Sequence, residues 1–142
     1  MTEQSRFSNH CAGVVYEPAR DLHWTAEDVT PEPVTDEEAQ AAIDKLNAEG
    51  FGGFNDWRIP EVEVLFPLAD RTRHHPAIDT EFFPTCKSDW YLTATDDASE
   101  EKSEDTGHSD YAWVVYFGGG YSYINNRHLR FRVRAVRGPA RQ

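Results

Sequence analysis

The strongest constraint on the fold is the order in which two kinds of pattern occur along the chain. Residues 111–117 are an unbroken apolar and aromatic run that is typical of a strand, and apolar residues alternate with arginines within 129–137. A period of two is typical of a β-strand that buries one face. The segments 90–95 and 121–125 are expected to be further strands, and the three glycines at 118–120 predict a hairpin turn between 111–117 and 121–125.

A helix is predicted earlier in the chain, beginning after Thr35. Thr35 and Glu38 have the spacing of a capping box, in which each side chain satisfies a free backbone N–H. Gly50 supplies a stop signal. A second helix of about two turns is expected after Pro60 and is limited by Pro67. The apolar face of the first helix is predicted to consist of Ala39, Ala42, Ile43 and Leu46.

Helices that come early and strands that come late favour an α+β fold over a βαβ sheet. The 142 residues have the usual size of one domain, so we expect a single domain over 1–142 with a substantial core. No apolar run approaches the roughly 20 residues of a membrane span, and the first ten residues show no secretory signal. These observations predict a cytoplasmic or virion-associated protein, with Cys11 and Cys86 reduced, although a bond between them stays open.

The charge of the chain is unevenly distributed. The formal net charge is -11, all 25 acidic residues lie within 1–110, and residues 111–142 contain six arginines and no acid. One interpretation is that the arginines pair with the acidic part of the same domain. The other is that they form a site for an anion. The overall acidity argues against binding to nucleic acid.

Short motifs along the chain resemble a known family when their order and spacing are taken together. They are GVVYEPARDLHW at 13–24, NDWRIP at 55–60 with EVL at 63–65, PAID at 76–79 with FFP at 82–84, WYLTAT at 90–95, AWVVYFG at 112–118 and RVRAVR at 132–137. In this respect the chain is similar to the Lcl C-terminal domain family, which is named after a bacterial collagen-like adhesin. The resemblance covers about residues 6–138.

The resemblance implies a C-type-lectin-like fold, with two helices beside a twisted antiparallel sheet. It also implies a binding module, because members occur in surface adhesins and in phage or prophage proteins. Ala135 stands where such chains often have cysteine, so a disulfide at that point is excluded. We expect Trp57, Trp90 and Trp113 in the core, and Asp56 and Arg58 holding loops together.

The segment that precedes the last strand is the candidate binding face. It is rich in Tyr, Ser, Asn and Arg, which form adaptable contact surfaces at a low entropic cost. An ordinary polar hairpin is the competing interpretation. Two arginines would add positive charge in an otherwise acidic protein. The candidate binding residues are Tyr121, Tyr123, Asn125, Asn126, Arg127 and Arg130.

Metal sites and catalysis have weak support in the sequence. His74, His75 and His108 do not have the spacing of a zinc site, and the acidic residues within 96–110 lack the order of an EF-hand. We therefore expect no metal or cofactor, and a mobile acidic loop at 96–110. The motifs of nucleophile elbows, P-loops and dinucleotide sites are missing, which predicts a protein that is not an enzyme.

Two functions follow as expectations. The first is a module that binds a protein or a glycan, plausibly encoded by a phage or prophage and carried on a virion or tail. The second is an intracellular acidic inhibitor that occupies the basic site of a host nucleic-acid enzyme. The adhesin-like resemblance favours the first, and the strongly negative charge favours the second.

Overall fold

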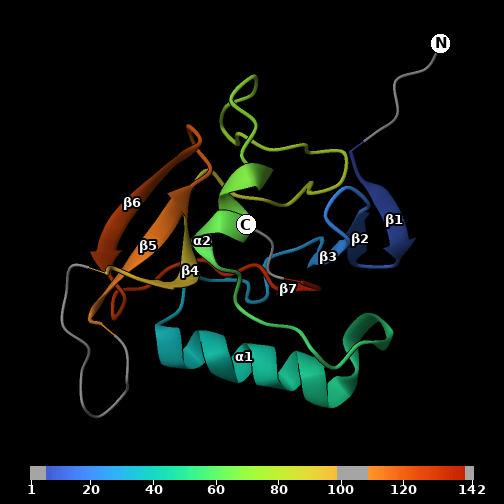
Figure 1. Cartoon of the computed structure of the whole chain (residues 1–142), viewed down its shortest axis with the longest axis horizontal. Helices are drawn as coiled ribbons and strands as arrows, with labels where there is room; N and C mark the ends of the chain where they lie inside the picture. The colour runs from blue at the N-terminus through green and yellow to red at the C-terminus, as the bar shows by residue number, and fades with distance from the viewer. Residues whose placement is uncertain (1–5, 99–108, 140–142) are drawn as a thin grey trace.

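The computed structural model of the chain describes residues 6–98 and 109–139. Its elements confirm the predicted α+β class, with two helices and two antiparallel sheets (Figure 1). In chain order they are β1 (Ser8–Cys11), β2 (Val14–Glu17), β3 (Leu22–Thr25), α1 (Asp36–Glu49), α2 (Val62–Leu65), β4 (Trp90–Asp96), β5 (Tyr111–Tyr116), β6 (Tyr121–Asn126) and β7 (Val136–Arg137), with 3-10 turns at Phe51–Gly53 and Phe66–Leu68.

The first helix begins and ends as its sequence predicts. The Thr35 hydroxyl accepts a hydrogen bond from the Glu38 backbone N–H at 3.3 Å, and the Glu38 carboxylate accepts one from the Thr35 N–H at 3.0 Å. Gly50 ends the helix in the left-handed conformation, with φ of 65°. Ala39 and Ile43 are buried, so the predicted apolar face does turn inward. The second helix, α2, is short, as expected from Pro67.

The strands form two sheets, whereas a single twisted sheet was expected. One sheet has the order β1-β2-β3-β7, and the other has the order β4-β5-β6. In Figure 1 the two sheets stand on opposite sides of α2, and α1 runs below both. The strands of the three-stranded sheet were predicted from the local sequence at 90–95, 111–117 and 121–125, but the local sequence does not contain the pairing between distant strands.

The three-stranded sheet separates two groups of core side chains. On one face, Leu92 and Val114 belong to a cluster with Ile43 of α1. On the other face, Tyr91 and Val115 belong to a cluster with α2. Because successive strand residues point to opposite faces, one short sheet contributes to both clusters.

The segment around Trp57 carries out the structural role that was expected of it. Trp57 is buried, and its backbone N–H and C=O are both bound by the side-chain amide of Asn47, at 2.7 and 3.0 Å. The Asp56 carboxylate accepts two hydrogen bonds from Arg137, and the guanidinium of Arg58 donates to the carbonyl of Gly138. These contacts fix the loop after α1 to the C-terminal segment.

Trp90 and Trp113 are half-buried: Trp90 packs against the cluster that contains Ile43, so its prediction holds in part, whereas Trp113 belongs to neither core cluster and its prediction is wrong. Trp90 and Trp113 lie on opposite faces of the three-stranded sheet, and each of these faces contributes to a core cluster. The core elements, however, cover only part of each face of the three-stranded sheet. Alternation along a strand predicts the face on which a side chain lies. It does not predict how much of that face is covered by the other core elements.

Residues 129–137 do not form the continuous strand that was predicted, because only Val136–Arg137 is a strand. The segment instead makes isolated contacts with several elements and joins the two sheets. Leu92 N–H donates to the Arg132 carbonyl on the outer edge of β4, and Val136 exchanges two backbone hydrogen bonds with Arg58. Further backbone contacts join Phe131 to Val34 and β7 to β3.

The middle of the predicted acidic loop, 99–108, lies outside the described residues, as does His108. Cys11 is exposed, Cys86 is buried, and both are free thiols. Within 6–98 and 109–139, no helix is long and apolar enough to cross a membrane.

Candidate functional site

Four aromatic rings gather on one face of the three-stranded sheet, and we call them the ring surface: Trp90, Tyr116, Tyr121 and Tyr123. The register explains their meeting, since Trp90 pairs with Tyr116, and Tyr116 pairs with Tyr121 across the hairpin. Directly paired residues of an antiparallel sheet share a face. The ring centroids lie 4.7 Å apart for Trp90–Tyr116, 5.6 Å for Tyr116–Tyr121, 5.9 Å for Tyr121–Tyr123 and 5.2 Å for Trp90–Tyr123.

The two outer rings of this surface are open to solvent. Tyr121 is 48% exposed and Tyr123 is 53% exposed, while Trp90 and Tyr116 are half-buried beneath them. The rings form a closed circuit of contacts at the centroid separations preferred by aromatic pairs. The tyrosines are therefore held in place by their neighbours while about half of each residue stays exposed to solvent.

The glycine turn between β5 and β6 makes room for these rings. A Cβ atom at Gly118 would lie 2.6 Å or less from three atoms of the Tyr116 side chain, and a Cβ at Gly119 would lie 2.7 Å from the Tyr121 hydroxyl oxygen. Neither glycine is required by a positive φ. Glycine is favoured at these two positions because a side chain would collide with the tyrosines, and not because of the backbone conformation.

Of the six predicted binding residues, Tyr121 and Tyr123 lie on the ring surface. Asn125 lies on the same face, is half-buried, and accepts a hydrogen bond from the backbone N–H of Asn126. Asn126 accepts one in turn from the N–H of His128. Both amide side chains thus stabilise the turn after β6.

Arg127 and Arg130 do not supply the free positive charge that was expected. Arg127 is buried, donates to the Ser109 carbonyl at 2.8 Å and pairs with Asp96. The side chain of Arg130 is 62% exposed but pairs with Glu38 of α1 at 2.9 Å. Both arginines lie beyond the end of β6 at Asn126, so the alternation within β6 does not determine where their side chains point.

The arginine-rich end pairs with the acidic part of the domain, which confirms the simpler of the two interpretations of the charge pattern. Within the described part of 111–142, each arginine has a carboxylate partner at 3.4 Å or less. The pairs are Arg127 with Asp96, Arg130 with Glu38, Arg132 with Asp28 and Asp89, Arg134 with Asp28, and Arg137 with Asp56. These side chains therefore do not form an anion site.

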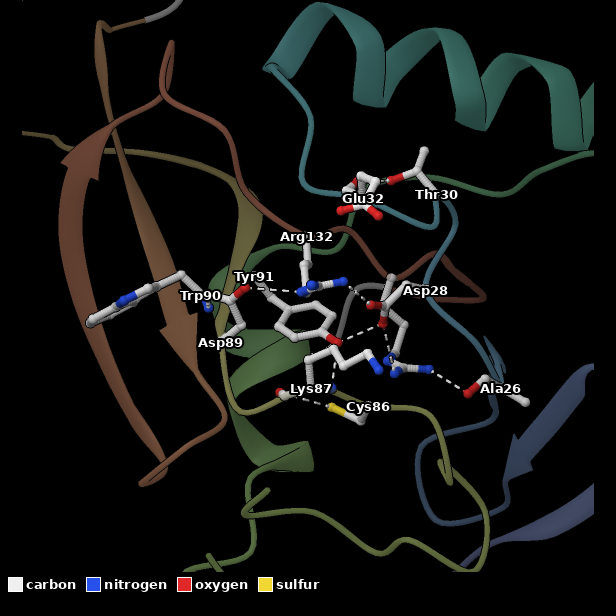
Figure 2. A network of polar contacts seen from close by, with 11 residues as sticks. Ala26, Asp28, Thr30, Glu32, Cys86, Lys87, Asp89, Trp90, Tyr91 and Arg132 are labelled. Atoms are coloured by element: carbon white, nitrogen blue, oxygen red, sulfur yellow. Dashed lines mark hydrogen bonds and ion pairs between the residues drawn. The ribbon is translucent and has the colours of Figure 1, made fainter. Parts of the chain in front are cut away.

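The most buried part of this pairing is centred on Asp28 (Figure 2). One oxygen of Asp28 accepts a hydrogen bond from the Tyr91 hydroxyl at 2.6 Å and faces Arg134 at 3.3 Å, and the other faces Arg132 at 3.4 Å. Burial raises the pKa of the Tyr91 hydroxyl, so it stays protonated and donates. Arg134 is fully buried and also donates to the carbonyls of Thr25 and Ala26. This network joins the loop after β3 to β4.

Two hollows lie near the three-stranded sheet. One, of about 370 Å³, lies on the face opposite the ring surface, and we call it the groove. It is lined by Val62, Glu63, Phe66, Pro67, Trp113 and Ser122. The other, of about 460 Å³, lies between the first turn of α1 and β4, with both acidic and basic residues in its walls. Half-buried Trp113 thus borders the groove instead of filling the core.

Sequence reasoning found two rings of the ring surface and missed the other two. Trp90 was assigned to the core, and Tyr116 was read only as part of a strand. The pairing of 111–117 with 121–125 was predicted, and it would have placed Tyr116 beside Tyr121. For Trp90, the pairing of β4 with β5 was also needed.

Comparison with known proteins decides the family. The family model of the Lcl C-terminal domain matches residues 13–137. The chain belongs to the Lcl C-terminal domain family. The match contains the whole ring surface, the groove and the Asp28 network of this Lcl C-terminal domain. A search of curated proteins finds no match to the chain. Ala135, where the resemblance suggested that cysteine is frequent, is fully buried.

Proposed function

We propose that this Lcl C-terminal domain is a non-catalytic binding module that holds a protein or glycan ligand against its ring surface. The observation that carries the proposal is the exposure of Tyr121 and Tyr123 in a circuit of four rings. Contiguous patches of exposed aromatic side chains are uncommon away from contact surfaces. Tyr and Trp side chains dominate the binding energy of such surfaces.

The ring surface suits binding because it is already organised. Each tyrosine has few rotatable bonds, and its neighbours restrict these further, so little side-chain entropy remains to be lost on binding. The flat rings can cover a sugar ring or an apolar side chain, while the hydroxyl groups offer hydrogen bonds. The surrounding arginines are paired within the domain, so we propose recognition by ring contact and hydrogen bonding rather than by positive charge.

The finer fold assignment and the biological setting are part of the proposal. A C-type-lectin-like arrangement and a place on a phage or prophage particle are what the family resemblance implies. Both would put the ring surface on a module that is presented to a target. A binding function also fits the absence, in the sequence, of the motifs that carry nucleophilic or cofactor chemistry.

The test is a binding screen with matched tyrosine variants. The protein is applied to an oligosaccharide array and, in parallel, used to capture proteins from host lysate. For any ligand found, Tyr121→Ala/Tyr123→Ala should lose at least ~2 kcal/mol of binding free energy while folding normally. Tyr111→Ala is the control, since Tyr111 is also exposed but lies on the opposite face of the sheet. A ligand held equally well by the double variant would sink the proposal.

The acidic-inhibitor function is the second candidate, and the net charge of -11 favours it. An inhibitor of that kind would bind through its carboxylates. Neutralising acidic residues of 96–110 would then abolish binding to a basic enzyme, whereas the tyrosine variant would bind as the parent does. In the ring-surface proposal, the same neutralisation changes mainly the on-rate and the salt dependence.

A further inference from the structure

The outer edge of β6 carries unpaired backbone groups. In an antiparallel ladder, alternate residues bond to a given neighbour. The Arg127 N–H donates to the Asp110 carbonyl at 2.9 Å, which sets the phase of the β5–β6 ladder. Tyr121, Tyr123 and Asn125 therefore bond to β5. The N–H and C=O groups of Ser122 and Ile124 point away from the sheet, and they have no partner among the described residues.

The other three sheet edges in the described part of the chain are closed or irregular. The outer edge of β4 is bonded to Arg132, and β7 is bonded to Arg58. The register of β1 shifts between Asn9 and Cys11. By contrast, β6 pairs regularly with β5 over all six residues, and it carries no charge or proline. Natural proteins usually protect an edge strand with charges, proline, an irregular register or a covering segment, and among the described residues the β6 edge has none of these.

Both faces beside this edge offer contacts for side chains. On one face, the edge is flanked by Tyr121 and Tyr123 of the ring surface. On the other face, Ile124 is 42% exposed, and the groove of about 370 Å³ reaches β6 at Ser122. A strand added to β6 would place alternate side chains on these two faces, one set over the rings and the other towards the groove.

We propose that β6 binds an extended polypeptide segment of a partner protein, which adds to the three-stranded sheet as a fourth strand. The inference rests on the proposed function in so far as the ring surface forms one side of the site. The backbone ladder supplies the bonding, and the ring surface and the groove select apolar or aromatic side chains at alternate positions. The length of β6 matches a segment of about six residues.

The chemistry of the edge identifies this occupant. Only another extended backbone presents N–H and C=O groups with the alternation that Ser122 and Ile124 require. An oligosaccharide can cover the rings but lacks that alternation. The edge itself is uncharged within a chain of net charge -11, so the partner segment is uncharged at its centre and has basic rather than acidic flanks. A second copy would bring the same negative charge to the contact.

The experiment selects random peptides of about twelve residues, long enough to cover a six-residue strand with flanks, on the immobilised protein. Enriched peptides are synthesised, and their dissociation constants are measured for Ile124→Pro and Ile124→Ala. Both variants lose the same side chain, but only proline removes the outward N–H, which β5 does not use. Urea unfolding and near-ultraviolet circular dichroism check that both variants fold.

The expected result is peptides with alternating apolar residues that bind Ile124→Pro about tenfold or more weakly than Ile124→Ala. N-methylation of every second peptide residue should abolish binding when the methylated nitrogens are those that face β6. It should leave binding unchanged when they are the nitrogens that point away from β6. Equal binding to the two variants, or no enriched peptide, overturns the inference. So does binding of a sugar alone, or a stable dimer without peptide in sedimentation.

The two proposals can fail separately. A peptide that tolerates Ile124→Pro but is lost with Tyr121→Ala/Tyr123→Ala leaves the ring-surface function standing and overturns the edge pairing. A peptide that is lost with Ile124→Pro but still binds Tyr121→Ala/Tyr123→Ala supports edge pairing and overturns the role of the ring surface. Loss with both supports the combined site. If Ile124→Pro does not fold, the phase-dependent effect of peptide methylation decides the question, since it leaves the protein unaltered.

Discussion

The carboxylate of Asp28 lies 3.3 Å from the guanidinium of Arg134, which has no exposed surface. The two residues come from the loop after β3 and from the segment before β7, far apart in the sequence. A buried arginine without its counter-charge is strongly destabilising, because the desolvated cation is then unpaired. This pair therefore contributes strongly to the attachment of the C-terminal segment, beside the backbone bridges of Phe131, Arg132 and Val136.

Asp28→Asn should lower the free energy of unfolding by roughly 3–5 kcal/mol, since the amide keeps the size of the side chain but removes the charge that faces Arg134. The measurement is urea unfolding followed by tryptophan fluorescence. Arg130→Gln is the control, because the Arg130–Glu38 pair is exposed and should cost less than about 1 kcal/mol. Similar losses in the two variants would contradict the central place given to Asp28.

Trp57→Ala should be severely destabilising, by ~3–5 kcal/mol, as for other large aromatic truncations in a core. Trp57 is buried in the cluster beneath α1, and its indole N–H donates to the Phe51 carbonyl at 3.0 Å. Equilibrium unfolding in urea measures the loss. A loss below about 1 kcal/mol would be incompatible with this burial.

The stability of the domain should depend on the protonation of His23. Burial, followed by the nearby Arg137 and His10, lowers the pKa of His23, and Arg137 donates to its Nδ1 at 3.0 Å. A lowered folded-state pKa means that the neutral form is the stabilising one. Its contribution is present above the unfolded value of about 6.5 and is lost as pH falls through the folded value. His23→Gln should remove this part of the acid destabilisation.

His128 should behave in the opposite way. A hydrogen bond with Asp110 raises the pKa of His128, with a further contribution from Asp36. Its stabilising form is the cation, so the contribution is present below about pH 6.5 and is lost as pH rises through the folded pKa. Titration of the two histidines by proton NMR should give a midpoint for His128 above that for His23. The reverse order would contradict both assignments.

Gly119→Ala should disturb the ring surface without unfolding the protein. The new Cβ would lie 2.7 Å from the Tyr121 hydroxyl oxygen, and the end of an exposed side chain can move away cheaply. We expect a changed near-ultraviolet dichroism of the rings and a loss of unfolding free energy within about 1 kcal/mol. Ligand binding should weaken several-fold. An unchanged aromatic spectrum would show that Gly119 does not position Tyr121.

The sequence was most informative where structure depends on neighbours in the chain. The capping box at Thr35 and Glu38 and the glycine turn before Tyr121 are local, and each was predicted at its place. The family resemblance added the structural role of Trp57, which burial confirms. The six-residue binding hypothesis yielded two tyrosines on a common surface, because alternation holds within β6.

What failed depended on contacts between distant segments. Arg134 is buried together with Val133 and Ala135, which the alternation of the predicted strand does not explain, because isolated bridges rather than a continuous strand hold this segment. Trp90 joined the ring surface only through the pairing of β4 with β5. Arg127 turned inward because the chain bends after Asn126 and Asp96 lies beside it. None of these partners is near in the sequence.

The segment 131–137 contacts both sheets, and this has a consequence for how the protein acquires its structure during synthesis. The bridges from Phe131 to Val34, from Arg132 to Tyr91 and from Val136 to Arg58 all close long loops, which gives the topology a high contact order. A ribosome releases these residues after every other element of the domain. Until then the outer edge of β4 and the β3 edge stay open, so the nascent domain depends on protection from aggregation up to the last step.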